Sequence, residues 1–475
     1  MNFLAISIEI GILILALFVI AVDLILPRQE TRKSIACITI CGLLALLLYS
    51  FTQYHFDGSL YFYQNLYFVD NYSIFFKQLF IVAVLFTVLF SQDYTQALLR
   101  YRGEFYSLLL FALLGMCVLA SANDFLTAFV GLELMTISFY ILVGARMSSA
   151  NSSEAAVKYL VVGSASTAVM LYGISLVYGS TGSILFDEIC RNPHLLFATS
   201  LAGITMIMIG FFFKLSVIPF HMWAPDVYQG APTPVTALLA MGSKAAGLAV
   251  LMRVLFTAFP MMGGYWLPIL VVLSAVCMIG GNVMAIKQKD LKRMLAYSSI
   301  AQAGYMMVGI VAADMPGMKA VLFYAMLYVF ANVGAFAVLA VVEQQKGSTD
   351  HKAVRGLAKS APILAAVMTI SLLSMAGIPP TAGFAGKIYL FTAVVERGYL
   401  WLAFVGFVMS MISVYYYLLV AKAMYLGEDL EHTQIHISGA VRASVLLSVI
   451  GTLVIGVYPE QLANITNIAV QTFMR

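Results

Sequence analysis

Long apolar runs separated by short polar connections extend along the whole chain. A membrane-spanning helix needs about 20 consecutive, mostly apolar residues, and runs of this kind follow one another throughout the sequence. We therefore predict an all-α polytopic membrane protein. Its fourteen expected helices lie near residues 3–27, 34–54, 73–91, 105–121, 124–145, 155–178, 196–218, 233–259, 265–286, 291–313, 318–343, 361–396, 399–425 and 441–465.

The composition agrees with this pattern and excludes several classes of protein. Of the 475 residues, 62% are hydrophobic and 10% are charged, whereas soluble domains carry about 25% charged residues. A soluble globular protein, a disordered chain and a nucleic-acid-binding protein are therefore excluded. The cysteines are scattered without metal-ligand spacing, and no glycine-rich phosphate-binding motif follows a plausible strand. We expect a redox-inactive chain without a cofactor or a metal of its own.

Lysine and arginine residues are distributed unevenly between alternate connections. The connections after even-numbered helices carry only Arg191, Lys319 and Arg397. Those after odd-numbered helices carry many more, namely Arg28, Arg32, Lys33, Arg100, Arg102, Arg146, Lys287, Lys289, Lys292, Arg293, Lys346, Lys352, Arg355, Lys359 and the flanking Arg442. Because short cytoplasmic connections are enriched in these residues, we expect the odd-numbered connections to face the cytoplasm and both termini to face the opposite side.

Two of the predicted helices are interrupted by proline. The seventh runs into Lys214-Leu215-Ser216-Val217-Ile218-Pro219, and the twelfth contains Gly377-Ile378-Pro379-Pro380. Proline removes a backbone donor, and such a break persists in a membrane only where protein or water satisfies the freed groups. Because the two helices are five apart, they cross in opposite directions, as in inverted repeats with discontinuous helices at a transport site. Two unrelated kinks are the alternative.

The inverted-repeat interpretation divides the chain into four parts. Residues 105–259 form the first expected five-helix repeat, with helices four to eight, and residues 260–425 form the second, with helices nine to thirteen. Residues 1–104 contain helices one to three, and residues 426–475 contain helix fourteen.

Four ionisable residues lie deep inside apolar runs. Glu133 lies in helix five, Lys214 beside the break in helix seven, Lys244 well inside helix eight and Lys387 beyond the break in helix twelve. A charge at the centre of a bilayer costs about 2.5–3.5 kcal/mol on insertion scales, so four unpaired charges would cost roughly 10–14 kcal/mol. These residues must be paired, hydrated or neutralised, and they are the first candidates for function.

Proton transfer is the chemistry that these four residues suit. Glu133 and Lys214 are the deepest opposite charges in the first half, and we expect them to be partners. An ion pair that only fixes helix packing is the alternative, although buried pairs stabilise poorly compared with apolar packing. A buried lysine can release its proton, whereas arginine effectively cannot.

Other polar residues are weaker candidates. Lys158 follows Glu154 by four residues at the start of helix six, where an interfacial ion pair and a channel role are both open. His221 lies just past the break in helix seven, either as a relay between Lys214 and Lys244 or as a packed or solvated side chain. Four residues near helix ends are expected to extend their charged groups to the interface: Glu9, Asp23, Lys77 and Arg253.

Four sequence stretches carry a resemblance to a known family. The most specific runs from Phe213 to Val235 and reads FKLSVIPFHMWAPDVYQGAPTPV. The others are Gly131–Glu133, the run KRMLAYSS from Lys292 to Ser299, and the segment from Ala376 through Lys387; the tyrosines 415–417 before Lys422 also match. Over nearly its whole length the chain resembles the antiporter-like subunit N of the proton-pumping NADH:quinone oxidoreductase, respiratory complex I.

The resemblance implies a role for each buried charge. Glu133 would pair with Lys214 and modulate its proton affinity, and Lys214 would exchange protons in the first half-channel. Lys244 would lie on a central hydrophilic axis, and Lys387 would be the exit-side lysine of the second half-channel. Some relatives carry histidine in helix ten where this chain has Gln302. Glutamine cannot titrate, so we expect a water-bridged relay there.

The resemblance also implies where the protein works and with what. It implies two inverted five-helix repeats within fourteen helices, in a bacterial inner membrane, with periplasmic termini. NADH, FMN, iron–sulfur clusters and quinone would be bound by other subunits. The partners would be the other membrane-arm and peripheral-arm subunits, including neighbouring antiporter-like and small membrane subunits, together with the lipid bilayer and no nucleic acid.

Two other functions are weighed against this one. A subunit of a multisubunit Na⁺/H⁺ antiporter shares the fold and the lysines, but the run Asp226-Val227-Tyr228-Gln229-Gly230 and the whole-chain fit favour subunit N. A purely structural membrane scaffold would leave the four deep charges unexplained.

Overall fold

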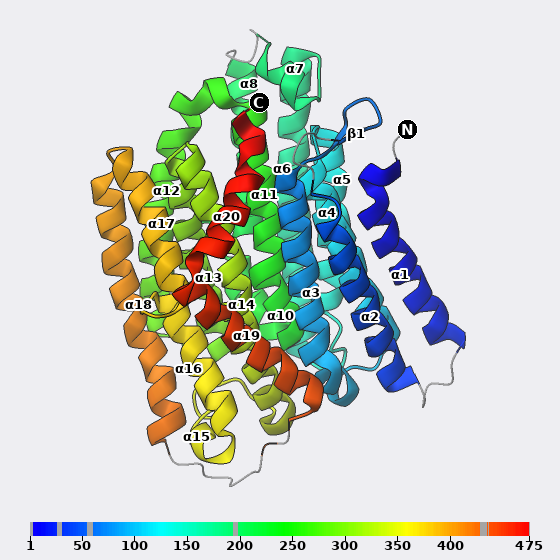
Figure 1. The fold of residues 1–475 in the computed structure, drawn as a ribbon, viewed down its shortest axis with the longest axis vertical. Coiled ribbons are helices and arrows are strands. Elements are labelled where there is room, and N and C mark those ends of the chain that lie inside the picture. Colours follow the sequence, from blue (N-terminus) through cyan, green and yellow to red (C-terminus); the bar gives the residue numbers. More distant parts are fainter. Residues whose placement is uncertain are drawn as a thin grey trace.

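A single bundle of long helices accounts for almost all of the computed structural model, which describes residues 3–25, 31–54, 60–192, 198–427, 435 and 437–474. Figure 1 shows the long helices side by side and roughly parallel. Within the described residues, thirteen helical stretches are long and apolar enough to cross a membrane. Their helices are α1 (Ser7–Ile25), α2 (Thr31–Phe51), α3 (Asn71–Leu98), α4 (Arg102–Ser121), α5 (Phe125–Val143), α6 (Ala150–Thr181), α8 (Ala198–Leu215), α10 (Thr233–Leu238) continued by α11 (Lys244–Arg253), α12 (Gly263–Ile286), α13 (Leu291–Val311), α14 (Met315–Lys346), α18 (Leu400–Leu426) and α19 (Gly439–Val457).

A fourteenth crossing consists of two shorter helices, as the sequence predicts. These are α16 (Pro362–Ala376) and α17 (Ala382–Glu396), separated by the predicted break. The seventh crossing is also discontinuous, because α8 ends at Leu215 and the short α9 (Trp223–Gly230) follows. The all-α architecture with two discontinuous helices is therefore confirmed.

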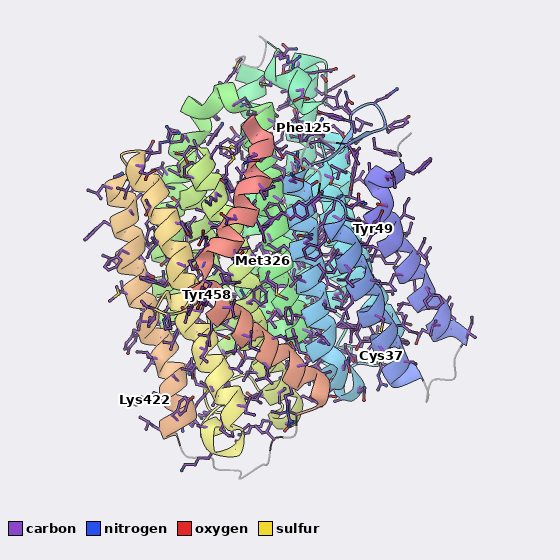
Figure 2. The ribbon with its side chains drawn as sticks, viewed as in Figure 1. Cys37, Tyr49, Phe125, Met326, Lys422 and Tyr458 are labelled. Carbon is purple, nitrogen blue, oxygen red and sulfur yellow. The ribbon has the colours of Figure 1, made fainter. Side chains whose placement is uncertain are left out.

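The last predicted helix is wrong in its C-terminal part. The expected run 441–465 is two helices, α19 and α20 (Pro459–Val470). Tyr458 between them has a non-helical backbone with φ −122° and ψ 67°, and Pro459 has no N–H with which to continue the helix. Figure 2 marks Tyr458 at this junction.

The two ends of the bundle differ in structure and charge. The described starts and ends of the chain lie at one end, together with the antiparallel hairpin β1 (Leu60–Phe62) and β2 (Tyr67–Val69) and the short α7 (Phe186–Cys190) (Figure 1). The other end carries α15 (Leu357–Ser360) and the basic connections after odd-numbered crossings. Arg28 lies outside the described residues. The alternation predicted from lysine and arginine thus separates a basic end from the end with both termini.

Helices differ in how much of their surface other helices cover. The crossing Thr233–Ala258 is buried from Thr233 to Leu255, and most residues of α3, α13 and α14 are buried as well. In contrast, α1, α2, α6, α18 and α19 expose many large apolar side chains. In a membrane, lipid or a neighbouring subunit covers such surfaces, whereas the buried helices form the core of the bundle.

The predictions for three charged residues near helix ends are wrong. Lys77 and Glu9 form a buried ion pair at 2.8 Å between α3 and α1. Arg253 and Asp70 form another at 2.9 Å, with both side chains 2% exposed. Each of these charges lies beside an opposite charge, on a neighbouring helix or, for Arg253, at the residue that caps α3, so it does not need to extend to the interface.

Gly383 supplies a stability test of the break between α16 and α17. A Cβ at residue 383 would lie 1.7 Å from the backbone oxygen of Ser374, so Gly383→Ala should force the two half-helices apart. We expect a loss of about 1–3 kcal/mol or more from overpacking, seen as a lower melting temperature and yield. The control is Gly179→Ala in α6, where nothing lies within 4 Å. Equal stability of the two variants would contradict the packing.

Candidate functional site

Among the described residues, three buried lysine side chains have no carboxylate partner. Lys214 on α8 and Lys244 on α11 are 1% exposed, and Lys387 on α17 is 4% exposed. They are the three lysines singled out from the sequence. An isolated ammonium in such a place is costly unless hydrogen bonds or opposite charges compensate it, so the groups around each one indicate what it can do.

Lys214 lies in the last turn of α8, immediately before the break. After Leu215 the chain turns sharply because Ser216 adopts a left-handed backbone with φ 56°. The turn is held by a hydrogen bond from the Val217 N–H to the Phe212 carbonyl at 2.9 Å. The Trp223 indole N–H also donates to the Phe213 carbonyl at 3.0 Å. These bonds satisfy carbonyls that the helix leaves unpaired at its end and fix the position of Lys214.

The Lys214 ammonium donates to the Thr136 hydroxyl on α5 at 2.6 Å. It also lies 5.7 Å from the Tyr159 ring centroid and 5.9 Å from that of Tyr140. Glu133, one turn before Thr136, is close enough to act on Lys214 electrostatically. The described residues contain no direct ion pair between the two, and Glu133 Oε1 is buried without a hydrogen-bond partner among them. The predicted partners are therefore neighbours whose charges interact without contact.

Lys244 lies at the centre of the crossing formed by α10 and α11, after a π-helical turn, Leu239–Ser243. Its ammonium donates to the Ser299 backbone carbonyl at 2.9 Å and to the Ser299 hydroxyl at 2.8 Å. Ser299 belongs to α13, so this contact joins the eighth crossing to the tenth. The helix that carries Lys244 also packs against the helix that carries Lys214, since a Cβ at Gly247 on α11 would lie 3.6 Å from Lys214 Cβ.

Lys387 closes the end of the broken helix α16. Its ammonium donates to the carbonyls of Met375 at 3.0 Å and Ala376 at 2.9 Å, and to the Ser410 hydroxyl at 2.6 Å. The C-terminal end of a helix carries partial negative charge and unpaired carbonyls, so a cation there is stabilised. Gly377 has φ 85°, and a Cβ there would lie 2.8 Å from Lys387 Cδ. The glycine therefore permits both the turn and the close approach of the lysine.

One feature is common to the three lysines. Each ammonium donates to a hydroxyl that donates its own proton to a backbone carbonyl. Thr136 donates to Leu132 at 2.6 Å, Ser299 to Ala296 at 2.8 Å and Ser410 to Ala376 at 2.7 Å. Because each hydroxyl proton is already used, the hydroxyl oxygen faces the lysine as an acceptor.

A row of polar side chains on α13 lies between Lys244 and Lys387. The row comprises Ser299, Gln302 and Tyr305, spaced three residues apart on one helix face. The Gln302 amide donates to the Met375 carbonyl at 3.0 Å, and this same oxygen accepts from Lys387. The Lys387 ammonium also lies 4.5 Å from the centroid of the Tyr305 ring. Hence α13 contacts Lys244 at one end of the row and the surroundings of Lys387 at the other.

His221 and Lys158, the weaker candidates, lie in different surroundings. His221 is close enough to Lys244 for electrostatic interaction, and its Nδ1 is buried without a hydrogen-bond partner among the described residues. Lys158 is partly exposed and forms ion pairs with Glu154 and with Asp226, each at 2.8 Å. It therefore lies in an interfacial charge network, which is one of the two alternatives left open by its sequence.

Asp226 connects this network to α13. Arg293 donates to the Asp226 carboxylate at 2.5 Å, opposite Lys158. Burial opposes ionisation of Asp226, but the hydrogen bonds from Lys158 and Arg293 outweigh it and lower the pKa of this carboxyl. The carboxylate thus stays charged at neutral pH and ties α9 to α6 and α13.

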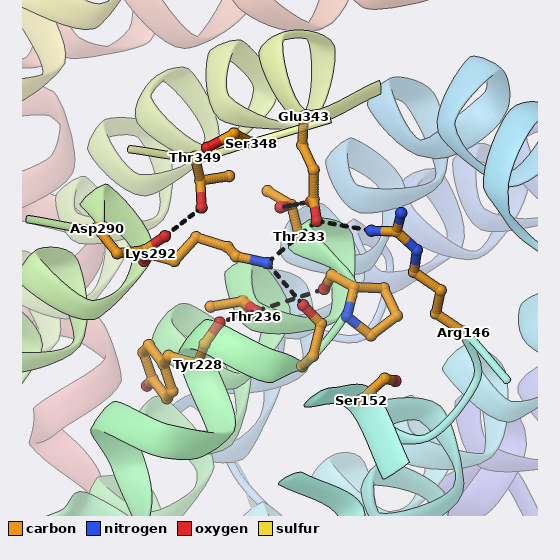
Figure 3. A network of polar contacts seen from close by, with 12 residues as sticks. Arg146, Ser152, Tyr228, Thr233, Thr236, Asp290, Lys292, Glu343, Ser348 and Thr349 are labelled. Atoms are coloured by element: carbon orange, nitrogen blue, oxygen red, sulfur yellow. Dashed lines mark hydrogen bonds and ion pairs between the residues drawn. The ribbon is translucent and has the colours of Figure 1, made fainter. Parts of the chain in front are cut away.

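A second buried cluster, which the sequence does not predict, is centred on Glu343 at the basic end (Figure 3). The Glu343 carboxylate is 6% exposed. It accepts from Tyr94 at 3.0 Å, from Arg146 at 3.1 Å and from Lys292 at 3.4 Å, and also from the Thr233 hydroxyl. Glu343 lies near the end of an apolar run, where a charge is ordinary, and only the fold shows that five segments meet there.

The Glu343 cluster anchors the two helices that meet at Lys244. Thr233 is the first residue of α10, which leads into Lys244, and Lys292 lies two turns before Ser299 on α13. Lys292 also donates to the Ala231 carbonyl at 3.0 Å. The cluster therefore fixes, at the basic end, the relative position of the helices that carry the Lys244–Ser299 contact.

Comparisons with known proteins agree on one family. The family described as NADH:quinone oxidoreductase/Mrp antiporter, TM, matches residues 122–413. The NADH-quinone oxidoreductase subunit N of Heliobacterium modesticaldum is 47% identical over 473 residues, covering 99% of this chain and 100% of the relative.

Solved structures share the fold. A chain of respiratory complex I from Thermus thermophilus with bound aureothin is 31% identical, with a TM-score of 0.81, and covers 96% of this chain and 99% of that one. A chain of the Mrp complex from Dietzia sp. has a TM-score of 0.87 over 100% of this chain and 98% of that one. At 20% identity, the Mrp match shows the fold alone.

The Glu343 cluster generates a stability prediction. Glu343→Ala would leave Arg146 and Lys292 buried without their carboxylate, which typically costs about 3–5 kcal/mol. We expect a clearly lower melting temperature, and a smaller loss in the double variant Glu343→Ala/Lys292→Met than the sum of the single losses. Glu154→Ala removes the exposed carboxylate that pairs with Lys158, and this control variant should melt at the original temperature. Additive losses in the double variant would contradict the cluster.

Proposed function

The chain belongs to the NADH-quinone oxidoreductase subunit N family, and we propose that Glu133, Lys214, Lys244 and Lys387 carry protons through it across the membrane. The observation that carries this proposal is the arrangement of three buried lysines in sequence, with the polar row of α13 between the last two. The other buried cations of the described residues, Lys77, Arg253 and Lys292, are each paired with a carboxylate, whereas these three lysines are not.

We infer that redox chemistry and its cofactors belong to other subunits of the complex. NADH, FMN, iron–sulfur clusters and quinone would be bound there, and the partners of this chain would be the other membrane-arm and peripheral-arm subunits. We place the basic end in the cytoplasm and both termini in the periplasm of a bacterial inner membrane. The excess of lysine and arginine at one end of the bundle supports this orientation.

Proton transfer through this chain needs an external driving force. Moving one elementary charge against a potential of 100 mV takes about 2.3 kcal/mol. The energy would come from electron transfer in other subunits and reach this chain as a conformational change. A movement of α5 is the simplest conformational change that would serve, because α5 carries both Glu133 and the Thr136 hydroxyl.

The first step concerns Glu133 and Lys214. Glu133 acts on Lys214 electrostatically without contacting it, so a small change in their separation alters the interaction between the two charges. Among the described residues, Lys214 has one hydrogen-bond acceptor, the Thr136 hydroxyl, whereas Lys387 has three. Lys214 is therefore the lysine whose proton is most readily released when Glu133 moves away.

The next steps follow the packing of the helices. Lys214 and Lys244 lie on adjacent helices, and His221 with its unpartnered Nδ1 lies near Lys244. From Lys244 the proton passes along Ser299 and Gln302 to Lys387. Gln302 cannot take up a proton, so water molecules complete this segment. Lys387 then releases the proton to the other side, after which its carbonyl partners favour reprotonation.

We also propose that the two discontinuous crossings belong to inverted repeats, residues 105–259 and 260–425. Support comes from the breaks themselves, which lie five crossings apart and each have a buried lysine beside them. An Na⁺/H⁺ antiporter subunit remains the second candidate by fold. Relatives of nearly full length that are named subunit N favour the first candidate.

Two substitutions of Lys214 distinguish the need for a positive charge at this position from the need for a group that exchanges protons. Lys214→Arg retains a cation but cannot release the proton, and Lys214→Met removes both. We expect both variants to reduce NADH-driven proton pumping in inverted vesicles by about tenfold or more, and Glu133→Ala to reduce it clearly. Lys158→Met, in the exposed network, serves as the control with little effect. Full coupled pumping in Lys214→Arg would refute the role of Lys214 as a proton carrier.

Gln302 tests the segment between Lys244 and Lys387. Gln302→Leu removes the amide that bonds the Met375 carbonyl and lines the row with a hydrocarbon, so we expect slow pumping with intact assembly. Gln302→His restores a polar and titratable group and should pump at nearly the original rate. The measurement is the initial rate of vesicle acidification per unit of NADH oxidation. Equal rates in the Leu and His variants would argue for a route that avoids α13.

A further inference from the structure

A basic cavity opens at the basic end of the bundle, away from the buried lysines. Its volume is about 710 Å³, and it lies between the end of α12, the connection from α14 to α15, and the end of α18. Four cationic side chains line it: Lys289, Lys352, Arg355 and Lys422. Figure 2 shows Lys422 at the lower end of α18.

The positive charge of this cavity is not compensated within the described part of the chain. None of the four cations forms an ion pair there, whereas Arg146, Lys158, Lys292 and Arg293 at the same end are all paired with carboxylates. Asp350 is the one carboxylate among the residues that line the cavity. His351 also lines it, and burial lowers the pKa of this histidine, so it is neutral at pH 7. The cavity therefore carries a net charge of about +3.

An apolar stripe on α18 leads directly to the cavity. Exposed large side chains follow one another at helical spacing of three or four residues, and the next position in the series is Lys422. The stripe comprises Leu400, Phe404, Phe407, Met411, Tyr415 and Leu418. Leu419 and Leu426 continue the apolar surface into the wall of the cavity. A ligand with an anionic head and a hydrocarbon tail matches both surfaces.

We propose that this cavity binds the phosphate-bearing headgroup of an anionic phospholipid whose acyl chains lie along α18. Basic pockets between membrane helices on the cytoplasmic side bind such headgroups. A free phosphate compound would match the four cations but would leave the apolar stripe without a role. This proposal is independent of the proton pathway, because it uses none of the residues assigned to proton transfer.

The test uses the intact complex reconstituted in phosphatidylcholine nanodiscs with a small fraction of a photoactivatable phosphatidylglycerol. The cross-linked peptides are identified by mass spectrometry. We expect labelling of the α18 end, and a decrease of about thirtyfold in Lys352→Gln/Lys422→Gln because two surface cations are lost. The matched control, Lys287→Gln/Lys359→Gln, removes two exposed lysines outside the cavity and should label like the original. Retained NADH oxidation verifies that all variants are assembled.

Four outcomes would overturn the proposal. Equal labelling by a phosphatidylcholine probe would remove the charge requirement, and undiminished labelling of the cavity variant would remove the site. Loss of labelling with millimolar glycerophosphoglycerol would assign the cavity to a soluble phosphodiester. The sequence after Gly427 contains Glu428, Asp429 and Glu431. Labelling that appears only when these three are neutralised would make this acidic segment the occupant.

Discussion

The hydrogen bond from a buried lysine to a hydroxyl that has already donated its proton is the interaction on which the interior of this protein depends. It occurs at Lys214 with Thr136, at Lys244 with Ser299 and at Lys387 with Ser410. In an apolar bundle each ammonium needs acceptors, and a serine or threonine whose proton is bonded to its own or a neighbouring backbone can only accept. The three sites therefore tolerate a cation that the surrounding residues would otherwise exclude.

The helix breaks give the outer two sites their different character. At the second break, α16 ends in the interior, and Lys387 satisfies carbonyls that have no helical partner. At the first, the Trp223 indole and the Val217 N–H satisfy the end of α8, which leaves the Lys214 ammonium with a single acceptor. With fewer hydrogen bonds than Lys387, the Lys214 ammonium depends more on its electrostatic interaction with Glu133. A movement between helices can change this interaction most easily. The surroundings of Lys214 can thus change with a helix movement, whereas those of Lys387 are fixed by its hydrogen bonds.

The sequence predicted the features that depend on a residue being unusual where it lies. Charges inside apolar runs identified Glu133, Lys214, Lys244 and Lys387, and prolines located the two breaks. It did not identify Thr136, Ser299 or Ser410, because hydroxyl residues are common in membrane helices and only the contact makes them special. It also did not identify Glu343, whose four hydrogen-bond donors come from distant segments. The interfacial location predicted for Glu9, Lys77 and Arg253 was wrong, because the spacing of residues along the chain does not show which helices are neighbours. Proline likewise ended α19 within a run that looked continuous.

The central claim is that the three lysines act in series, so that one proton path passes through all of them. The most direct test is the number of protons moved per NADH oxidised by complexes carrying Lys214→Met, Lys244→Met or both, with complex content measured in parallel. If the path is in series, each single variant should lower the number of protons moved per NADH by the same amount. The double variant should lower it no further, because either substitution blocks the whole path. A double variant that loses the sum of the two single losses would contradict the account and indicate two independent routes.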